Sequence, residues 1–465
     1  MIIEQNIVIT TRDGREITLN EQQVEAVHKI QNWLRPNNKE IAFTLSGFAG
    51  TGKTTIVTYI LDNYNGQVCV TAPTHKAKKV IQRTTGRKAL TIQGLLGLRP
   101  NTSLENFDIN NPQFHPIAEK LISEYELVVV DEASMVNNGL FTLLIREAKE
   151  NNVKILFMGD SAQAPPINEK LSRVFTEVKD CVNLTKVERQ AESNPLLGIC
   201  DAIRDNLTEE CPFPTFDNVN DAGGLKYITN QLDIEHLLEE MYLSDDYQQD
   251  YNHCKTVAYQ NTTVKGWNRR IRKLIFPNAD SPIVEGDLFM AYNTVVVNEK
   301  YNAKKDSFFL ENSNDYEVSR ILNKYKSGPI GMVKVIMTNV DDGSVQTFPI
   351  VYPDSENYKK FYMEWKLFHD TAQNATPIDR KKAWAKYYDF KNQHLLISDI
   401  TVGKDLIPKD LDYGYAITAH KCQGSTYTNV IIDNSDMLLI KKVVDRNKLS
   451  YVALSRPTKM AYLIQ

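Results

Sequence analysis

The run with the clearest chemical meaning combines glycines, one lysine and several hydroxyl side chains. It reads Gly47-Phe48-Ala49-Gly50-Thr51-Gly52-Lys53-Thr54-Thr55, just after the strand-like residues 41–45. Glycines let the backbone curl so that successive N–H groups point at a phosphate, and a helix that begins after them adds the positive end of its dipole. Lys53 can bridge the β- and γ-phosphates, and the Thr54 hydroxyl can ligate Mg²⁺. All residues of the run except Phe48 are therefore predicted to bind ATP.

Two adjacent carboxylates follow the apolar run 127–130 further along the chain. Asp131, at the carboxyl end of a predicted strand, suits a magnesium partner held through water. Glu132 beside it suits polarisation of the water that attacks the γ-phosphate. Because a base for hydrolysis is present, these residues predict an ATPase that turns over rather than a nucleotide-binding switch.

Three further side chains have the chemistry to serve a γ-phosphate. The Gln163 amide, in the turn after residues 153–158, can donate to a phosphate oxygen and accept from the attacking water. Arg189 and Arg456 carry guanidinium groups of the kind that neutralises charge on a transferred phosphoryl group. The predicted catalytic residues are Lys53, Asp131, Glu132, Gln163, Arg189 and Arg456.

The elements that must position these residues alternate between strand-like runs and longer helical segments. Buried parallel strands are expected at 41–45, 68–71, 127–130 and 153–158, with crossover helices at 54–63 and 75–83. A second alternating region follows, with strands at 255–259 and 430–433 and a helix at 262–275. The pattern predicts an α/β fold with more than one parallel sheet.

Length and composition agree with several packed domains. At roughly 150 residues per domain, 465 residues make two to four folded units, and 42% hydrophobic residues can fill their cores. A net charge of −4, from 54 basic and 58 acidic residues, disfavours a protein that coats DNA. No stretch approaches the ~18 apolar residues of a membrane helix, and residues 1–11 contain no cleavable apolar segment, so a cytoplasmic protein is expected.

Residues 284–400 have a different character. Short alternating segments with turn signals at 291–351 predict a small β-barrel. Aromatic residues then recur at helical spacing over 358–368 and 384–390. Two readings of these aromatics are open: two amphipathic helices packed on each other, or a platform on which nucleic-acid bases stack.

The ordered set of motifs resembles superfamily 1 class B DNA helicases, the group of Dda and RecD. The matching segments are residues 19–23 for the adenine-reading Q motif, 72–78 for motif Ia, 184–189 for motif IV, 415–425 for motif V and 451–456 for motif VI. The resemblance implies that Gln23 contacts the adenine and that Arg456 is the arginine finger. It also implies translocation from 5′ to 3′, which no residue spacing shows.

The resemblance further implies two RecA-like motor domains with a pin and an accessory domain. Their expected bounds are 1–185 for domain 1A, with the pin insertion at about 95–120; 186–283 and 401–465 for domain 2A; and 284–400 for domain 2B, an SH3-like β-barrel with a helical tower. Phe107 is the preferred pin tip, with Phe114 second, because an aromatic ring can stack on a base pair.

The residues expected to contact DNA come mostly from these motifs. They are Pro73, Thr74, His75, Lys76, Thr91, Asn261, Thr418, His420, Gln423 and Phe107. Basic runs at 76–88 and 265–273 add positive charge, which is read either as solvated helix faces or as grooves for a phosphate backbone.

The sequence thus predicts an ATP- and Mg²⁺-dependent DNA helicase that acts on single strands and single-strand/duplex junctions. The alternative is an ATPase stimulated by single-stranded DNA or RNA that displaces proteins with little unwinding. A monomer is expected, with single-strand-binding or replisome proteins as candidate partners. For a phage-encoded chain the location is the host cytoplasm.

Overall fold

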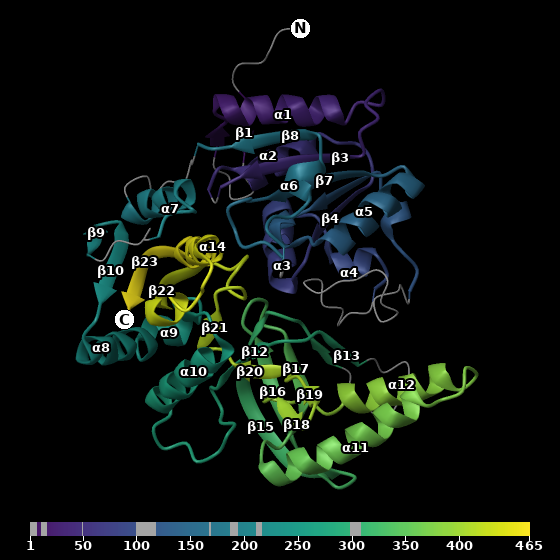
Figure 1. The fold of residues 1–465 in the computed structure, drawn as a ribbon, viewed down its shortest axis with the longest axis vertical. Helices are drawn as coiled ribbons and strands as arrows, with labels where there is room; N and C mark the ends of the chain where they lie inside the picture. The colour runs from purple at the N-terminus through teal and green to yellow at the C-terminus, as the bar shows by residue number, and fades with distance from the viewer. Residues whose placement is uncertain are drawn as a thin grey trace. The chain divides into compact units, whose positions relative to one another are not determined.

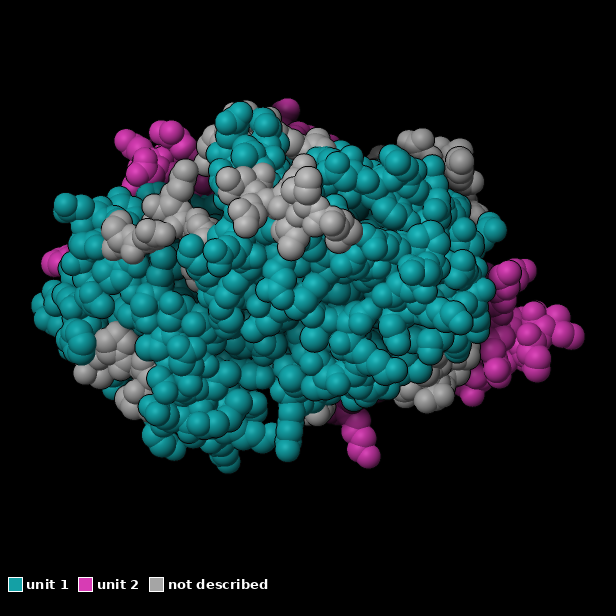
Figure 2. Space-filling model, turned by 90° about the horizontal axis from the view of Figure 1, so that it is seen from above, with its two compact units in different colours: residues 1–234, 252–259, 418–465 teal, residues 235–251, 260–417 magenta. Residues whose placement is uncertain are grey.

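The chain forms two compact units, which Figure 2 colours separately. The computed structural model describes residues 7–10, 16–48, 50–98, 118–166, 169–186, 194–210, 216–297 and 308–465. Unit 1 comprises Met1–Ile234, Asn252–Tyr259 and Thr418–Gln465, and unit 2 comprises Glu235–Tyr251 and Gln260–Ile417. Ala49, Arg189 and residues 99–117 of the predicted pin insertion, with Phe107 and Phe114, lie outside the described residues.

A six-stranded parallel sheet is the centre of the first part of unit 1. Its order is β5-β4-β6-β7-β3-β8. The strands are β3 (Ala42–Gly47), β4 (Val68–Ala72), β5 (Ala89–Thr91), β6 (Leu127–Val130), β7 (Lys154–Gly159) and β8 (Asp180–Leu184). Along β6, Leu127 and Val129 enter one hydrophobic cluster and Val128 and Val130 enter another. Both faces of the sheet are therefore buried, as parallel sheets require.

The register brings the ends of three strands to one edge of this sheet. Val130 of β6 pairs with Phe157 of β7, and Leu45 of β3 pairs with Met158 of β7. In open parallel sheets, ligands bind outside the carboxyl ends of the strands. The segments that follow β3, β6 and β7 therefore lie where a ligand site is expected.

Helices and turns connect these strands, as Figure 1 shows. They are α1 (Glu21–Trp33), α2 (Lys53–Asp62), α3 (His75–Thr85), α4 (Ile92–Leu95), α5 (Asn138–Asn151), α6 (Val174–Glu177) and the 3-10 turns η2 (Ile122–Glu124) and η3 (Ala133–Met135). A hairpin of β1 (Val8–Thr10) and β2 (Glu16–Thr18) precedes α1. α3 begins because the Thr74 hydroxyl accepts from the Ala77 N–H, and it ends at Gly86, whose φ is 55°.

A second, mostly parallel sheet of unit 1 is assembled from distant segments. Within the unit its order is β11-β22-β23-β10-β9, with only β9 antiparallel. The strands are β9 (Asn218–Asn220), β10 (Gly223–Ile228), β11 (Cys254–Ala258), β22 (Tyr427–Asp433) and β23 (Pro457–Ile464). The accompanying helices are α7 (Pro195–Asp205), α13 (Asn434–Met437) and α14 (Val443–Leu454). α8 (Gln231–Tyr242) and β21 (Ala416–Thr418) carry the chain across the division between the units.

Unit 2 is built on a five-stranded antiparallel sheet of order β17-β16-β15-β12-β20. Its strands are β12 (Leu288–Ala291), β15 (Asp315–Ser327), β16 (Ile330–Asn339), β17 (Val345–Val351) and β20 (Leu411–Tyr413). The other elements are α9 (Asp245–Gln249), α10 (Asn261–Ile275), β13 (Val295–Val297), β14 (Phe308–Leu310), α11 (Ser355–Gln373), α12 (Arg380–Asn392), β18 (Ile400–Val402) and β19 (Asp405–Ile407). Closure of the antiparallel sheet into a barrel stays a prediction.

The aromatic residues of α11 and α12 pack on one another. The rings of Phe361 and Phe390 are 5.4 Å apart between centroids, and the Trp365 indole N–H donates to the Tyr387 hydroxyl at 3.1 Å. Phe361 is fully buried and Trp365 nearly so. The packing interpretation of the aromatic pattern is thus confirmed for these rings. No helix in the described part of the chain is long and apolar enough to span a membrane.

Candidate active site

The glycine-rich run forms a loop between β3 and α2. Gly50 and Gly52 have φ angles of 83° and 81°, a conformation that glycine adopts without strain. Gly52 precedes the first turn of α2, and no side chain caps that turn. The backbone N–H groups of the first turn of a helix point toward its N-terminus, which here is the glycine-rich loop. The Lys53 ammonium donates to the carbonyls of Gly47 and Phe48 at 2.6 and 2.7 Å. The loop thus has the backbone geometry of a phosphate cradle, with the lysine inside it.

Gln23 holds this loop from α1. Its amide N–H donates to the Thr51 carbonyl at 3.1 Å, and its amide oxygen accepts from the Asn20 N–H at 3.0 Å. Asn20 returns the bond by accepting from the Gln23 N–H, which makes a capping box at the start of α1. Only 3% of Gln23 is exposed. Gln23 therefore positions the phosphate loop, and its contact with adenine stays a prediction.

Asp131 and Glu132 follow β6 at the edge of the first sheet. Asp131 Oδ1 accepts from the Glu132 N–H at 2.8 Å. Glu132 has a φ of 51°, the left-handed region that non-glycine residues rarely adopt. A Cβ on Gly424 would lie only 3.4 Å from Glu132 Oε1, so the segment after β21 approaches this carboxylate closely. Two segments far apart in the sequence therefore meet at Glu132.

Burial and charge shift the pKa of both carboxyl groups. Burial and then the neighbouring Glu132 raise the pKa of Asp131 to about 7, against the lowering effect of the Glu132 N–H bond and of Lys53. Burial also raises the pKa of Glu132, as does Asp160, while the Arg456 guanidinium and Lys53 oppose the shift. A carboxyl group with a raised pKa is a better proton acceptor near neutral pH. The arrangement therefore suits Glu132 to general-base chemistry.

A buried polar network joins the turn after β7 to the C-terminal segments. The Gln423 amide donates to Gln163 Oε1 at 3.0 Å and to the Ser134 hydroxyl at 2.9 Å. The Tyr451 hydroxyl of α14 donates to Asp160 Oδ2 at 2.7 Å. Gln163 and Gln423 are 6% and 8% exposed. Gln423, expected among the DNA contacts, therefore has its amide bonded to Gln163, one of the predicted catalytic residues.

Arg456 follows α14 and is held by the chain around it. Its guanidinium donates to the Val452 carbonyl at 3.0 Å, the Ser455 hydroxyl at 2.8 Å and the Ser425 carbonyl at 3.3 Å. The side chain is 7% exposed. Its positive charge lowers the pKa of Glu132 and so opposes the effect of burial on that carboxyl group.

The predicted DNA residues divide by their contacts. The Thr74 hydroxyl caps α3, and the Thr91 hydroxyl accepts from the Gly94 N–H at 3.1 Å at the start of α4. Lys76 is 8% exposed and lies 5.2 Å from the centre of the Tyr427 ring. His75 Nδ1 lies 3.3 Å from the Lys78 ammonium nitrogen.

The remaining expected DNA residues lie on three segments. Pro73 is buried just before α3. Thr418 accepts from the Lys421 N–H at 3.3 Å, and the His420 ring lies 6.5 Å from that of Tyr259. Asn261 is exposed at the first turn of α10, in unit 2. Their contacts with DNA stay predictions.

Four residues of this region were not predicted as site residues. Ser134, Asp160 and Tyr451 belong to the network around Gln163 and Gln423. The Arg204 guanidinium lies 3.6 Å from the centre of the Phe48 ring, beside the phosphate loop. Tyr451 stands inside the motif VI segment, and Asp160 lies in the turn that carries Gln163, which are signals for them. Ser134 and Arg204 have none, because only tertiary packing brings η3 to Gln423 and α7 to Phe48.

Comparison with known families adds to this geometry. The AAA domain family matches residues 18–229, and the UvrD-like helicase C-terminal domain family matches residues 413–464. The ATP-dependent DNA helicase dda of Enterobacteria phage T4 is 23% identical over 437 residues, covering 89% of this chain and 92% of that protein. In sequence the chain is therefore similar to ATP-dependent DNA helicases of the Dda type.

One further relative and one solved structure are also similar to this chain. The ATP-dependent RecD2 DNA helicase of Deinococcus radiodurans is 32% identical over 157 residues, which are 33% of this chain and 20% of that protein. A solved structure titled for DNA unwinding at forked dsDNA by two coordinating Pif1 helicases has a TM-score of 0.52 at 17% identity, covering 96% of this chain and 92% of that one. The second similarity concerns the fold alone.

The raised pKa of Asp131 predicts how the stability of this helicase depends on pH. Because the folded-state pKa is about 7 instead of 3.8, the ionised carboxylate destabilises the folded chain. This effect is absent below pH ~4, grows up to pH ~7 and is complete above it. Asp131→Asn keeps an oxygen for the Glu132 N–H, and it should raise the free energy of unfolding by roughly 1–3 kcal/mol near pH 8 but little near pH 4.

Denaturant unfolding with a metal chelator at both pH values measures the change. Asp221→Asn, at an exposed position, is the control and should have little effect at either pH. An equal stabilisation by Asp131→Asn at both pH values would contradict the assignment.

The Gln163–Gln423 bond predicts an energetic coupling. Because each amide is buried and bonded to the other, Gln163→Ala and Gln423→Ala should be non-additive by about 1 kcal/mol in the free energy of unfolding. A double-mutant cycle measures this coupling. The same cycle with the exposed Gln67 in place of Gln423 should be additive. Additivity in both cycles would show that the two amides do not interact in solution.

Proposed function

We propose that this chain is an ATP-driven DNA helicase that moves 5′ to 3′ along single-stranded DNA and unwinds duplex. The observation that carries the proposal is the meeting, within unit 1, of a phosphate loop, two half-buried carboxylates and the Gln163–Gln423 network. These groups together supply nucleotide binding and hydrolysis. The DNA substrate and the direction rest on the similarity to Dda-type helicases.

Thr54 and Asp131 would hold Mg²⁺ at this site. Mg²⁺ usually takes one or two protein oxygens and completes its shell with water and substrate phosphates. The hydroxyl of Thr54 and the carboxylate of Asp131 match that preference for oxygen ligands. When bound, Mg²⁺ neutralises charge on the β- and γ-phosphate oxygens.

The proposed hydrolysis step assigns one role to each of these side chains. Lys53 and the N–H groups at the start of α2 bind the phosphates, and the water oxygen attacks the γ-phosphorus while its proton passes to Glu132. The bond to the β-phosphate oxygen breaks, and ADP leaves. Gln163 orients the water, with Gln423 fixing its amide. Arg456 stabilises charge on the transferred group, and Arg189 is proposed as a second guanidinium.

Motif V, residues 415–425, contains both proposed DNA contacts and a residue that bonds to the ATP site. Thr418 and His420 are proposed DNA contacts, and Gln423 of the same segment bonds to Gln163. A change at the γ-phosphate that moves Gln163 would therefore reach the DNA-contacting residues through one continuous turn. A second set of proposed DNA contacts comes from the segments after β4 and β5. They are Pro73, Thr74, His75, Lys76 and Thr91.

The wider organisation is proposed from the same similarity. Domain 1A would span 1–185, domain 2A 186–283 and 401–465, and domain 2B 284–400. The chain would act as a cytoplasmic monomer on single strands and forks, with single-strand-binding or replisome proteins as partners. The relatives support this DNA substrate: dda is named an ATP-dependent DNA helicase, and the Pif1 title describes unwinding at forked dsDNA.

Two substitutions test the ATP site. Lys53→Ala should abolish ATP hydrolysis because it removes the ammonium from the loop, while single-strand binding remains. Glu132→Gln should bind ATP but hydrolyse it about 10²- to 10⁴-fold more slowly, because the base is lost. Steady-state ATPase assays with oligothymidylate measure both, and the exposed Lys39→Ala is the control. Undiminished hydrolysis by Lys53→Ala would reject the site.

Two duplexes, each with one single-stranded tail, test direction and unwinding together. The chain with ATP should separate a duplex that carries a single 5′ tail and leave one with a 3′ tail intact. Strand separation of the two matched substrates is measured by fluorescence, and ATPase rates with matched DNA and RNA oligonucleotides are compared. Hydrolysis without separation of either duplex would favour a protein-displacing translocase, and preferred separation from the 3′ tail would reverse the direction.

A further inference from the structure

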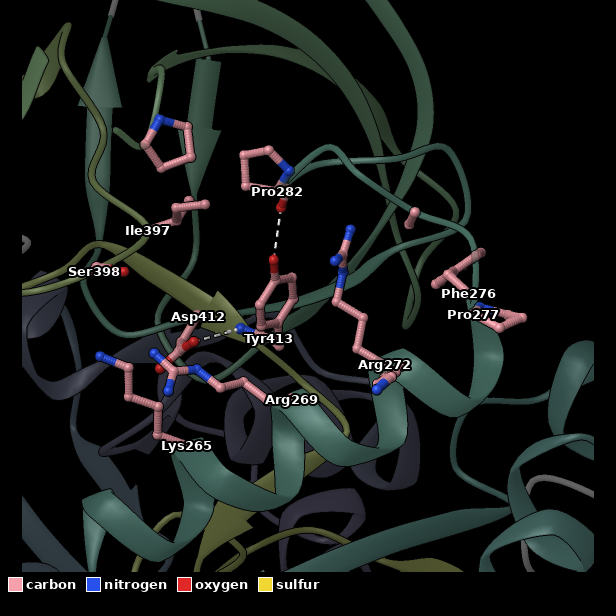
Figure 3. A pocket seen from close by; sticks show the side chains of 13 residues that line it. Lys265, Arg269, Arg272, Phe276, Pro277, Pro282, Ile397, Ser398, Asp412 and Tyr413 are labelled. Atoms are coloured by element: carbon pink, nitrogen blue, oxygen red, sulfur yellow. Dashed lines mark hydrogen bonds between the residues drawn. The ribbon is translucent and has the colours of Figure 1, made fainter. Parts of the chain in front are cut away.

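A cavity of about 370 Å³ lies within unit 2, between α10 and the sheet that carries β20. Four basic residues of α10 are among its lining side chains: Lys265, Arg269, Arg272 and Lys273. Figure 3 shows Lys265, Arg269 and Arg272 projecting from the helix on the side of Asp412 and Tyr413. The cavity is therefore open to one strongly basic helix face.

Three of these cations are uncompensated. Lys265, Arg269 and Lys273 are exposed and follow at intervals of four residues, so they form one stripe along α10. None of the three forms a hydrogen bond or an ion pair with another described residue of the chain. At 1.5 Å per residue, the stripe spans about 12 Å along the helix axis. Positive charge spaced in this way suits successive groups of a linear polyanion.

The other charged lining residues are already paired. Arg272 makes two bonds to the carboxylate of Asp287, at 2.7 and 2.9 Å, and Asp287 is fully buried. Asp412 forms an ion pair with Lys409. Arg272 and Asp412 therefore build the framework of the cavity, and the net positive charge comes from the stripe.

The cavity is held in shape and has apolar walls. The Tyr413 hydroxyl donates to the Pro282 carbonyl at 2.6 Å, a bond drawn in Figure 3. Asn268, on α10, bonds to both backbone groups of Ala416, at 2.7 and 3.1 Å. Phe276, Pro277 and Ile397 add apolar surface. A volume of 370 Å³ lies at the lower end of the range for small-ligand pockets, about 300–1,000 Å³.

We propose that this cavity is a nucleic-acid subsite, in which the α10 stripe binds phosphodiester groups and the apolar wall receives one nucleoside. Apolar walls beside a row of cations match the chemistry of a single strand, whose bases are apolar on their faces and whose backbone is anionic. The inference rests on the proposed function in that both take nucleic acid as ligand. It concerns residues of unit 2 that the ATP site and the motifs do not use.

The test compares two triple variants of the full chain with the same change in charge. Lys265→Gln/Arg269→Gln/Lys273→Gln removes the stripe, and Lys359→Gln/Arg380→Gln/Lys381→Gln removes three exposed charges elsewhere in unit 2. The equilibrium binding of fluorescent oligothymidylate, without ATP, is measured across salt concentrations. Loss of three phosphate contacts should lower the slope of log affinity against log salt by about 2 for the stripe variant alone.

Two further measurements separate a contact from a general charge effect. Lys265→Arg/Lys273→Arg should keep the parent slope because the charge is retained. Chemical acetylation of the parent chain, read by mass spectrometry, should show that oligothymidylate protects Lys265 and Lys273 but not Lys359 and Lys381. Inorganic phosphate, ATP and oligoglutamate are tested as separate protecting probes.

Each outcome decides the proposal. Equal slopes for the two triple variants, or no protection of Lys265 and Lys273 by oligothymidylate, would overturn the subsite while leaving the ATP site and unwinding intact. Protection by ATP, phosphate or oligoglutamate in place of oligothymidylate would assign the cavity to that ligand and also overturn it. If the parent chain binds no oligonucleotide under any salt, the subsite and the proposed function both fail.

Discussion

The site depends on keeping two adjacent, half-buried carboxylates beside positive charge. Burial disfavours the ionised form of both, and the neighbouring charges of Glu132 and Asp160 further raise the pKa of Asp131 and of Glu132, respectively. Lys53 and the Arg456 guanidinium offset this cost from opposite ends of the sequence. The phosphate loop, the end of β6 and the end of α14 must therefore be assembled together for Asp131 and Glu132 to be tolerated. Folding and the ability to hydrolyse a nucleotide thus share one electrostatic constraint.

The polar network around Gln163 links the hydrolytic site to segments near the C-terminus through hydrogen bonds. Gln423 donates to both Gln163 and Ser134, and Tyr451 donates to Asp160. Leaving a buried amide without its hydrogen-bond partner costs free energy. A displacement of Gln163 that keeps its bond to Gln423 therefore also displaces Gln423. Because Gln423 shares a short turn with Thr418, the same bonds that order the hydrolytic site reach the residues proposed to hold DNA.

The basic residues of α10 show how one charge run can serve two purposes. Arg272 forms an ion pair with the buried Asp287. Arg270 forms an ion pair with Glu235 and lies against the Trp267 ring. Lys265 and Lys273, on the stripe, have no such partner in the described part of the chain. The two readings of this run, a structural face and a surface for phosphate, thus apply to different members of it.

The sequence by itself determined what depends on neighbours in the chain. The phosphate loop, the strand at 127–130 and the helix after Gly52 were predicted within a residue or so, because glycine conformation, strand burial and helix starts are local. Tertiary structure alone decided that Gln423 bonds to Gln163, 260 residues away, and that Arg272 but not Lys265 is neutralised. Such pairings depend on which elements pack together, and the spacing of residues along the chain does not predict that packing.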